Sequence, residues 1–183
     1  REQMNYNTNL IKPSTQTDNT MATKDTLKVL TSSERVDWCT PVEILDLVYK
    51  MGPIGLDPCG NTQSLVDAER TIELPEDGLQ TPWVGHGLVY VNPPYGRAIS
   101  GWLQKCATEA ALGAEIVLLM PSRTDTRWFH KWAVKADVLC FWKGRITFDG
   151  APSPAPFPSV LAYWGPNIDL FDEVFDSFGQ IVY

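Results

Sequence analysis

Short apolar runs alternate with polar or proline-containing segments along most of the chain. These runs predict buried strands, at 54–57, 70–74, 88–91, 115–120, 138–142, 144–148 and 159–164. Apolar residues spaced three or four positions apart predict helices, at 41–50, 99–112 and 125–134. The alternation predicts an α/β fold with a mostly parallel sheet, and the last two strands predict a C-terminal antiparallel hairpin.

The first 30 residues lack this periodicity and are rich in Asn, Thr, Ser and Gln. They predict a disordered tail at 1–30, with Met21 as a candidate natural start, ahead of a single domain at 31–183. The first helix has a predicted start signal, in which Thr40 is the N-cap, Pro41 the first helical residue and Glu43 the partner in a capping box. No apolar run approaches the roughly 18 residues of a membrane span, so no membrane partner is expected.

The charge of the chain is acidic overall but unevenly distributed. A net charge of −7 argues against indiscriminate binding to nucleic acid. Positions 97–145, however, hold eight Lys and Arg against four acids, whereas 146–183 hold five acids and no basic residue. The basic stretch predicts either a patch that attracts a polyanion or an ordinary solvated helix face, and charge alone leaves both open.

The four cysteines are scattered at positions 39, 59, 106 and 140, and the chain has only two histidines. Neither a CxxC pair nor a Cys-His cluster is present, so the sequence predicts no metal site. We interpret the cysteines as the reduced thiols of an intracellular protein.

The segment Val91-Asn92-Pro93-Pro94-Tyr95-Gly96 directly follows a predicted buried strand. Two prolines lack backbone donors and end the strand, so a plain turn is the simplest interpretation. The side-chain oxygen of Asn92 and the carbonyl of Pro93 can, however, accept hydrogen bonds from one amino group, while Tyr95 offers a flat face to a base. Asp57 also ends a predicted strand, and ligands of such sheets bind beyond the carboxyl ends of the strands.

The Asn-Pro-Pro-Tyr tetrapeptide resembles the catalytic motif of amino-methyltransferases that use S-adenosyl-L-methionine, chiefly the N6-adenine DNA enzymes. An ordered set of further motifs extends the resemblance: Trp38-x-Thr40-Pro41, Leu56-Asp57-Pro58-Cys59, Asp77-Gly78-Leu79 with Trp83, Trp128-Phe129-His130 and Lys143-Gly144-Arg145-Ile146-x-Phe148. Together they are similar to the phage-type (Dam-like) DNA N6-adenine methyltransferases over about 37–164. This resemblance implies a Rossmann-like methyltransferase sheet, S-adenosyl-L-methionine as cofactor and double-stranded DNA as partner.

The resemblance also implies a role for each matching residue. The catalytic clamp on the target adenine would be Asn92, Pro93, Pro94 and Tyr95. The cofactor would be bound by Trp38, Thr40, Pro41, Asp57, Pro58, Cys59, Glu73 and Asp77. Phe148 would cover the other face of the flipped base, and Arg123, Arg127 and Arg145 would contact DNA, with Lys143 as a further phosphate contact. Plain alternatives stay open: solvated turn acids for Glu73 and Asp77, a core aromatic for Phe148, and exposed cations for the basic residues.

Two local features qualify this picture. Asn61 and Thr62 follow Gly60, where many methyltransferases have a further glycine. His130 is predicted to be packed on its helix, and the expected chemistry requires no general base.

These features predict a site-specific DNA adenine-N6 methyltransferase that acts on a flipped-out adenine in the cytoplasm of a bacterium or phage-infected cell, as in restriction–modification. Other amine substrates remain alternatives, namely an RNA base, cytosine or a protein glutamine, and so does a non-catalytic module that binds cofactor or DNA. We expect no separable target-recognition domain, so the loops at 121–127 and 149–159 are the expected readers of DNA sequence. The oligomeric state is open, with a monomer favoured.

Overall fold

The structure is a computed structural model that describes residues 38–183. The predicted tail and the candidate start at Met21 lie outside these residues. Within them, no helix is long and apolar enough to cross a membrane.

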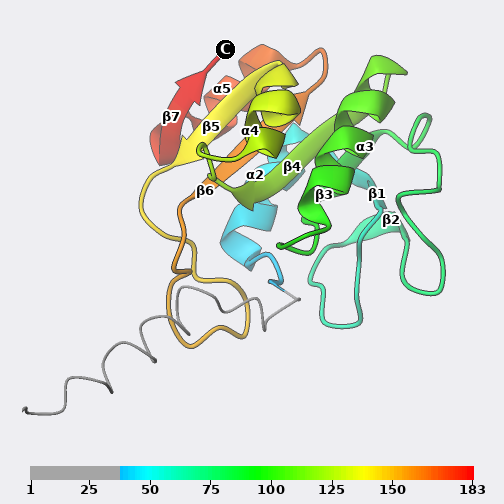
Figure 1. Cartoon of the computed structure of the whole chain (residues 1–183), viewed down its shortest axis with the longest axis horizontal. Helices are drawn as coiled ribbons and strands as arrows, with labels where there is room; N and C mark the ends of the chain where they lie inside the picture. Colours follow the sequence, from blue (N-terminus) through cyan, green and yellow to red (C-terminus); the bar gives the residue numbers. More distant parts are fainter. Residues whose placement is uncertain (1–37) are drawn as a thin grey trace, which may run out of the picture. The chain divides into compact units, whose positions relative to one another are not determined.

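Seven strands form one sheet: β1 (Ile54–Asp57), β2 (Ala68–Thr71), β3 (Leu88–Val91), β4 (Glu115–Pro121), β5 (Val138–Trp142), β6 (Ser159–Trp164) and β7 (Gly179–Val182). Their order in the sheet is β2-β1-β3-β4-β6-β5-β7 (Figure 1). The first four strands pair in parallel. β6 runs antiparallel to both β4 and β5, and β7 is antiparallel to β5. The protein is therefore a mixed α/β structure, parallel in its first half and antiparallel at its end.

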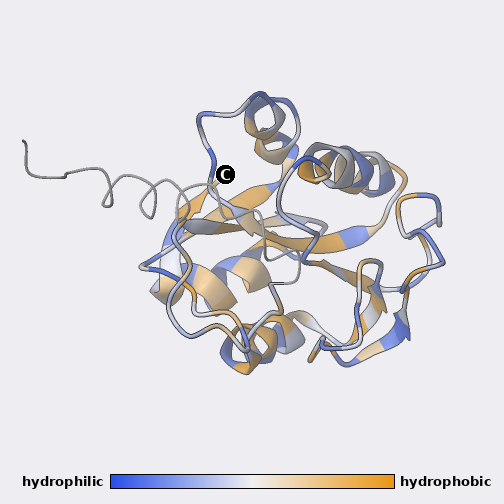
Figure 2. Ribbon diagram, turned by 60° about the horizontal axis from the view of Figure 1, so that its bottom comes forward, coloured by the Kyte–Doolittle hydropathy of each residue, from blue (hydrophilic) through white to orange (hydrophobic). Residues whose placement is uncertain are grey.

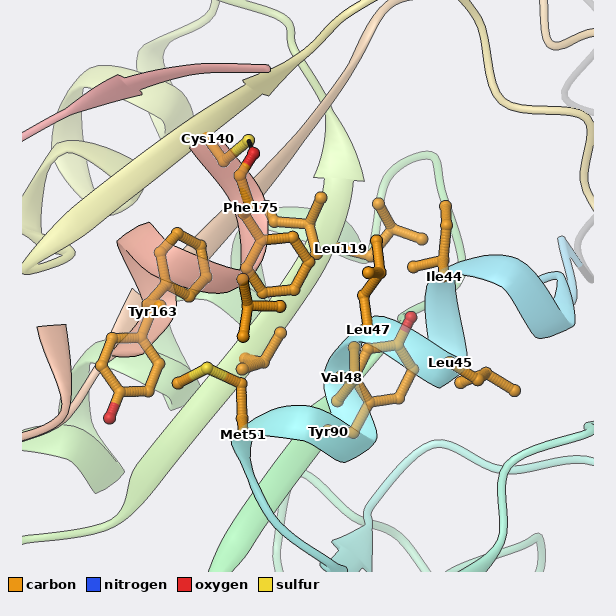
Figure 3. Packing of buried hydrophobic residues seen from close by; sticks show 14 of the residues in the cluster. Ile44, Leu45, Leu47, Val48, Met51, Tyr90, Leu119, Cys140, Tyr163 and Phe175 are labelled. Atoms are coloured by element: carbon orange, nitrogen blue, oxygen red, sulfur yellow. Dashed lines mark hydrogen bonds between the residues drawn. The ribbon is translucent and has the colours of Figure 1, made fainter. Parts of the chain in front are cut away.

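The helices cover both faces of the sheet: α2 (Val42–Met51), α3 (Ile99–Ala111), α4 (Arg127–Lys131) and α5 (Ile168–Phe175), with 3-10 turns at Ala133–Lys135 and Asp176–Phe178. Alternate residues of each strand face opposite sides, so every buried strand contributes to two cores. On β3, Tyr90 faces α2 and α5, whereas Val89 and Val91 face α3. The central strands are accordingly mainly hydrophobic in Figure 2. Figure 3 shows the first of these cores, where Leu47 and Val48 of α2 lie close to Tyr90.

Most predicted elements are present, and the differences have physical causes. The 144–148 segment is not a strand, so that half of the predicted hairpin is wrong. The antiparallel C-terminal end is present, but β6 pairs with β5 and β4 and lies between them. The second strand ends at Thr71, two residues before Glu73. The segment at 125–134 divides into α4 and a 3-10 turn. The sequence analysis missed α5 and β7, although α5 buries Phe171 and Phe175 against the sheet. His130 is exposed rather than packed, and its Nε2 lies 2.7 Å from the Thr124 carbonyl oxygen.

The predicted capping box is also wrong. The N-cap of α2 is Pro41, and no side chain caps the helix. The Thr40 hydroxyl is used elsewhere, because it lies 2.8 Å from the Tyr90 hydroxyl and accepts a hydrogen bond from Asn92. A local helix signal thus gave way to a buried long-range contact.

The connections around β1 determine where a ligand can bind. No helix separates β1 from β2 or β2 from β3 in the described chain. β2 lies on one side of β1 and β3 on the other, so the strand order reverses direction at β1. Open α/β sheets bind ligands at such a switch point, beyond the carboxyl ends of the strands. Asp57 is the last residue of β1 and Asn92 directly follows β3, so the two residues flank the switch point.

Gly55 allows the β2–β3 loop to pack tightly against β1. A Cβ at this position would lie 1.5 Å from the carbonyl oxygen of His86, and the register of β1 against β3 shifts here. We predict that Gly55→Ala destabilises the protein by about 2 kcal/mol or more, because the added methyl group meets backbone rather than a mobile side chain.

Gly101→Ala is the matched control. Gly101 lies exposed within α3, and no atom lies within 4 Å of a Cβ added there. The substitution should therefore stabilise the protein by roughly 0.5–1 kcal/mol, because alanine is the better helix former. Urea denaturation of both variants measures the difference. Equal stabilities would contradict the packing assigned to Gly55.

Candidate functional site

A cleft of about 260 Å³ opens at the switch point. Four segments far apart in sequence supply most of its lining, at 38–40, 57–61, 76–78 and 92–94. Apolar side chains complete it, among them Ile72, Leu74 and Trp102. Leu74 is 89% exposed although it lines the cleft, so a bound apolar group would cover it. The parallel order of the sheet brings these segments together, because the carboxyl ends of β1 and β3 lie at the same edge.

Asp57 is the most unusual charged group of the cleft, since only 3% of it is exposed. Burial raises the pKa of its carboxyl group from 3.8 to about 6, against the opposing effect of hydrogen bonds from Cys59. The Cys59 amide donates one of these bonds to Asp57 Oδ1 over 3.1 Å. The carboxylate at pH 7 is therefore held in an environment that disfavours its charge, and a cation in the cleft would relieve that cost.

The turn after Asp57 is shaped by Gly60 and Asn61. A Cβ on Gly60 would lie 2.2 Å from the Thr71 side chain and 3.3 Å from Asp57 Oδ2, so a side chain there would push the turn off β2. Asn61 accepts a hydrogen bond from the Gln63 amide through Oδ1 over 2.8 Å. This Asx turn orders the loop without a second glycine, which explains the departure noted in the sequence.

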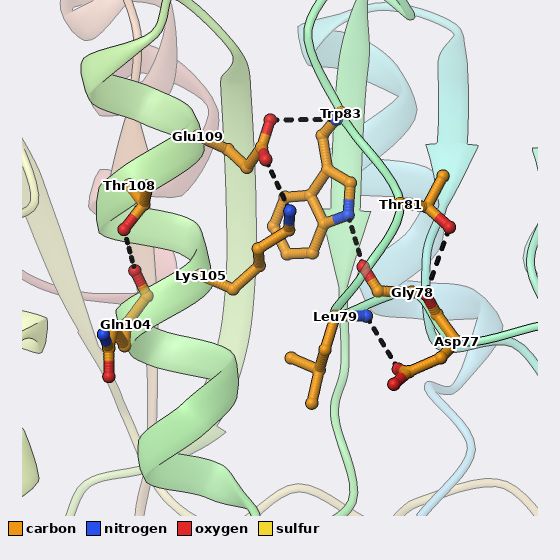
Figure 4. A network of polar contacts seen from close by, with 9 residues as sticks. All are labelled: Asp77, Gly78, Leu79, Thr81, Trp83, Gln104, Lys105, Thr108 and Glu109. Carbon is orange, nitrogen blue, oxygen red and sulfur yellow. Dashed lines mark hydrogen bonds and ion pairs between the residues drawn. The ribbon is translucent and has the colours of Figure 1, made fainter.

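The loop at 76–78 forms a wall of the cleft beside the β1 turn, and Figure 4 shows the polar contacts that support it. The Asp77 carboxylate accepts a hydrogen bond from the Leu79 amide over 2.9 Å. Gly78 packs directly on the β1 turn, because a Cβ there would lie 1.8 Å from the Pro58 carbonyl oxygen. The Trp83 indole donates to the Gly78 carbonyl over 2.9 Å.

Helix α3 anchors this wall through Glu109. The Trp83 amide donates to Glu109 Oε2 over 2.9 Å, and Lys105 pairs with Glu109 Oε1. Burial would raise the pKa of Glu109, but the hydrogen bonds from Lys105 and from the Trp83 amide outweigh it and lower the pKa. Glu109 therefore stays ionised and holds the wall in place.

The Asn92 side chain is held by polar contacts at both ends of its amide. Its Nδ2 donates to the Trp38 carbonyl over 2.5 Å and to the Thr40 hydroxyl over 3.0 Å. Its Oδ1 accepts from the Tyr95 hydroxyl over 2.8 Å. Burial raises the pKa of Tyr95 well above its ordinary value, so its hydroxyl remains a donor. The amide oxygen keeps one free acceptor position, because a carboxamide oxygen has two lone pairs.

Four aromatic rings, which we call the aromatic cluster, gather beside Asn92: Trp38, Tyr95, Phe148 and Phe157. Tyr95 meets Phe148 with ring centroids 6.0 Å apart and planes at 76°, and meets Phe157 at 5.6 Å and 83°. A base stacked between two rings needs parallel faces roughly 7 Å apart. Phe148 is 1% exposed and meets Tyr95 edge-on, so in this structure it is a core aromatic and not the second face of a base slot.

The charges divide into two zones. Three acids line the cleft, Asp57, Glu76 and Asp77, and no Lys or Arg is among its described lining residues. Basic side chains instead follow the carboxyl ends of β3, β4 and β5: Arg97, Arg123, Arg127, Lys143 and Arg145, all exposed. Among the described residues, Arg123 pairs with Asp125 and Arg145 contacts the Ala155 carbonyl, whereas no ion pair involves the other three.

The structure gathers most of the predicted site residues but not all of them. Those that line the cleft are Trp38, Thr40, Asp57, Pro58, Cys59, Asp77, Asn92, Pro93 and Pro94. Tyr95 lies behind Asn92, while Pro41 and the exposed Glu73 are outside the lining. The sequence analysis assigned no ligand role to Ile72, Leu74, Glu76 or Trp102. Trp102 lies on the predicted helix at 99–112, and apolar spacing cannot distinguish a core tryptophan from one at a cleft wall.

The family described as "DNA N-6-adenine-methyltransferase (Dam)" matches residues 28–159. The match covers most of the chain, and the chain therefore belongs to this family, as its motifs predicted. The mixed sheet is compatible with a methyltransferase fold. A search of curated proteins found no match.

The buried carboxyl of Asp57 yields a stability prediction. The pKa of Asp57 is higher in the folded protein, about 6, than the unfolded value of 3.8. The free energy of unfolding is therefore highest below about pH 4, where the group is protonated in both states, and it falls as the pH rises to about 6. We predict that Asp57→Asn, which keeps an acceptor for Cys59, is more stable than wild type at pH 8 by up to about 3 kcal/mol. The difference should disappear below about pH 4.

Urea denaturation at several pH values measures this difference. Asp77→Asn is the control, because Asp77 is exposed and the substitution keeps its turn; its effect should stay within about 0.5 kcal/mol at all pH values. A less stable Asp57→Asn protein at pH 8 would refute the cost assigned to this carboxylate.

Proposed function

We propose that the protein is a site-specific DNA adenine-N6 methyltransferase that uses S-adenosyl-L-methionine and acts on a flipped-out adenine. The observation that carries the proposal is the position of the Asn92 amide, which lines the acidic cleft and keeps an acceptor position on its oxygen. Family membership supports the reaction, and the geometry supports the residue roles. The cytoplasm of a bacterium or a phage-infected cell would suit such an enzyme.

The cleft residues fit S-adenosyl-L-methionine by their chemistry. The cofactor carries a cationic amino group and a sulfonium. Asp57 and Asp77 offer the cleft carboxylates that form no ion pair among the described residues, while Glu76 is paired with Arg70 outside the lining. The same charges would repel a cofactor bound through phosphates. Asp57 and the 58–61 turn would hold the amino-acid part of the cofactor, and Ile72, Leu74 and Trp102 would contact the faces of its adenine ring. When bound, the cofactor would supply a sulfonium methyl group for N6 of the target adenine: the methyl C–S bond breaks, the thioether S-adenosyl-L-homocysteine leaves, and N6 loses a proton to solvent.

The chain's own contribution is positioning. Asn92 Oδ1 and the Pro93 carbonyl would accept the two N–H groups of the adenine amine, so that its nitrogen lone pair faces the cleft. No hydrogen bond among the described residues uses the Pro93 carbonyl. The Tyr95 ring would support the target adenine. Because burial raises the pKa of Tyr95, its hydroxyl stays protonated at neutral pH and is unsuitable as a general base. Transfer to an amine of this kind requires orientation and exclusion of water, not a general base.

DNA would approach along the exposed basic side chains at the carboxyl edge. The target adenine must leave the duplex, at a cost of a few kcal/mol. To stack on Tyr95, it must displace a ring of the aromatic cluster. Phe157 is partly buried and lies on the long loop between β5 and β6, at the bottom of Figure 1, whereas Phe148 is in the core. Phe157 is therefore the ring that we expect to move.

The central test is transfer of radiolabelled methyl groups from S-adenosyl-L-methionine to adenine-containing duplexes. Wild type should label duplexes with adenine and not matched duplexes in which adenine is absent. Asn92→Ala should lower kcat by about 100-fold or more, because the amine loses an acceptor that orients it, while cofactor binding changes little.

Asn167→Ala is the control, since Asn167 is bonded to Glu115 and is not part of the cleft lining. Near-normal turnover of Asn92→Ala would refute the clamp. Cofactor-induced stabilisation of wild type without methyl transfer to any DNA would favour the non-catalytic binding module instead.

The basic edge yields a prediction on salt dependence. Arg127 is exposed and begins α4, just after the carboxyl end of β4. Arg127→Ala should reduce the slope of log affinity against log salt by about 1 in magnitude, because one phosphate contact is lost. Lys135→Ala should leave the slope unchanged, since Lys135 precedes β5 at the amino edge and lies over Trp132. Fluorescence anisotropy on a labelled duplex measures both; equal slopes for the two variants would refute the assigned face.

A further inference from the structure

We propose that Tyr90 and Thr40 are positioning residues that fix the orientation of the Asn92 amide, so that its oxygen and not its NH2 group faces the substrate amine. The inference rests on the proposed function, because it concerns how the clamp is held. Neither residue would contact the reacting atoms through this role. They act through Asn92.

The orientation matters because the two ends of a carboxamide have opposite hydrogen-bonding character. The target amine is a donor, so it requires the oxygen of Asn92, and a flipped amide would present two donors to a donor. The Trp38 carbonyl is only an acceptor, and it therefore selects the NH2 group on its side. Thr40 Oγ1, at 3.0 Å, receives the second hydrogen of that group. Both N–H groups of Asn92 are then used away from the substrate.

A hydroxyl group alone would not enforce this choice, because it can donate as well as accept. Tyr90 fixes the position of the threonine side chain, since its hydroxyl lies 2.8 Å from Thr40 Oγ1. Whichever of the two hydroxyls donates, Thr40 Oγ1 keeps a lone pair for Asn92 Nδ2. Tyr90 is fully buried and Thr40 is 2% exposed, so water does not compete for these groups. Burial also raises the pKa of Tyr90, so the hydroxyl stays protonated.

The chemical identity of these residues supports a polar role. Phe and Val would fill nearly the same volumes in this core without polar atoms to satisfy, and buried polar groups are costly unless paired. The two hydroxyls instead form a chain from the core to Asn92. Trp38 and Thr40 also line the cleft, so a bound cofactor would pack against the segment that orients Asn92.

Tyr163 provides a matched control for Tyr90. It is equally buried, belongs to the same hydrophobic core, and faces Tyr90 across β4, since Val117 pairs with both residues. Its hydroxyl is bonded to Glu115 and to the Asn167 amide, and none of these residues lines the cleft. Figure 3 shows the hydroxyls of Tyr90 and Tyr163 pointing in opposite directions.

The experiment compares Thr40→Val, Thr40→Ser, Tyr90→Phe and Tyr163→Phe in the full chain. For Thr40→Val we expect kcat to fall by about 10- to 100-fold, with the cofactor Kd from calorimetry changed by less than about threefold. Thr40→Ser, which keeps the hydroxyl, should stay within about threefold of wild type. Tyr90→Phe should lower kcat by about 3- to 10-fold, and Tyr163→Phe should not lower it.

A second measurement is independent of activity. The side-chain NH2 resonances of Asn92, assigned by their loss in Asn92→Ala, should exchange slowly with solvent in wild type and at least about tenfold faster in Thr40→Val. Unchanged kcat in Thr40→Val, equal losses in Tyr90→Phe and Tyr163→Phe, or failure of Thr40→Ser to restore turnover would each overturn the proposal. If wild type itself methylates no adenine, the proposed function fails, and amide exchange alone then decides whether Thr40 holds Asn92.

Discussion

The hydrogen bonds that Asn92 donates to Trp38 and Thr40 join parts of the chain more than 50 residues apart. They bring the segment ahead of α2 onto the carboxyl end of β3, and they orient an amide that local turn geometry would leave free to rotate. The same segment lines the cleft beside Asp57. These bonds therefore hold the Asn92 amide in a fixed orientation at the wall of the acidic cleft.

A DNA methyltransferase must bind a cationic cofactor and a polyanionic substrate, and the charged side chains of this protein are divided accordingly. An acidic cleft suits a cationic cofactor, and exposed basic side chains on the same edge suit the polyanion. Burying the Asp57 carboxylate is unfavourable for the isolated chain, as its raised pKa indicates. A cation bound in the cleft would offset this cost, and the free protein is less stable at the place where such a ligand would bind.

The aromatic cluster shows why a base-binding role is difficult to read from aromatic residues alone. Trp38, Tyr95, Phe148 and Phe157 pack edge to face or at a tilt, so their rings satisfy one another. Such packing stabilises the loop between β5 and β6 against the site. A base that stacks on Tyr95 would have to replace one of these rings. Of the two rings that contact Tyr95, Phe157 is partly buried, whereas Phe148 is in the core.

The sequence by itself determined the central strands, the long helix α3 and the family, because continuous apolar runs and ordered motifs are local signals. It also identified Asp57 and Asn92, whose positions at strand ends follow from the same runs.

Only the tertiary structure decided that Thr40 is bonded to Tyr90 and Asn92 instead of capping α2, that β6 lies between β4 and β5, and that Phe148 is in the core. Leu74 and Trp102 likewise became cleft residues only through the fold. Each of these outcomes depends on contacts between distant segments, whose burial and hydrogen bonding outweigh the local preferences that a sequence pattern records.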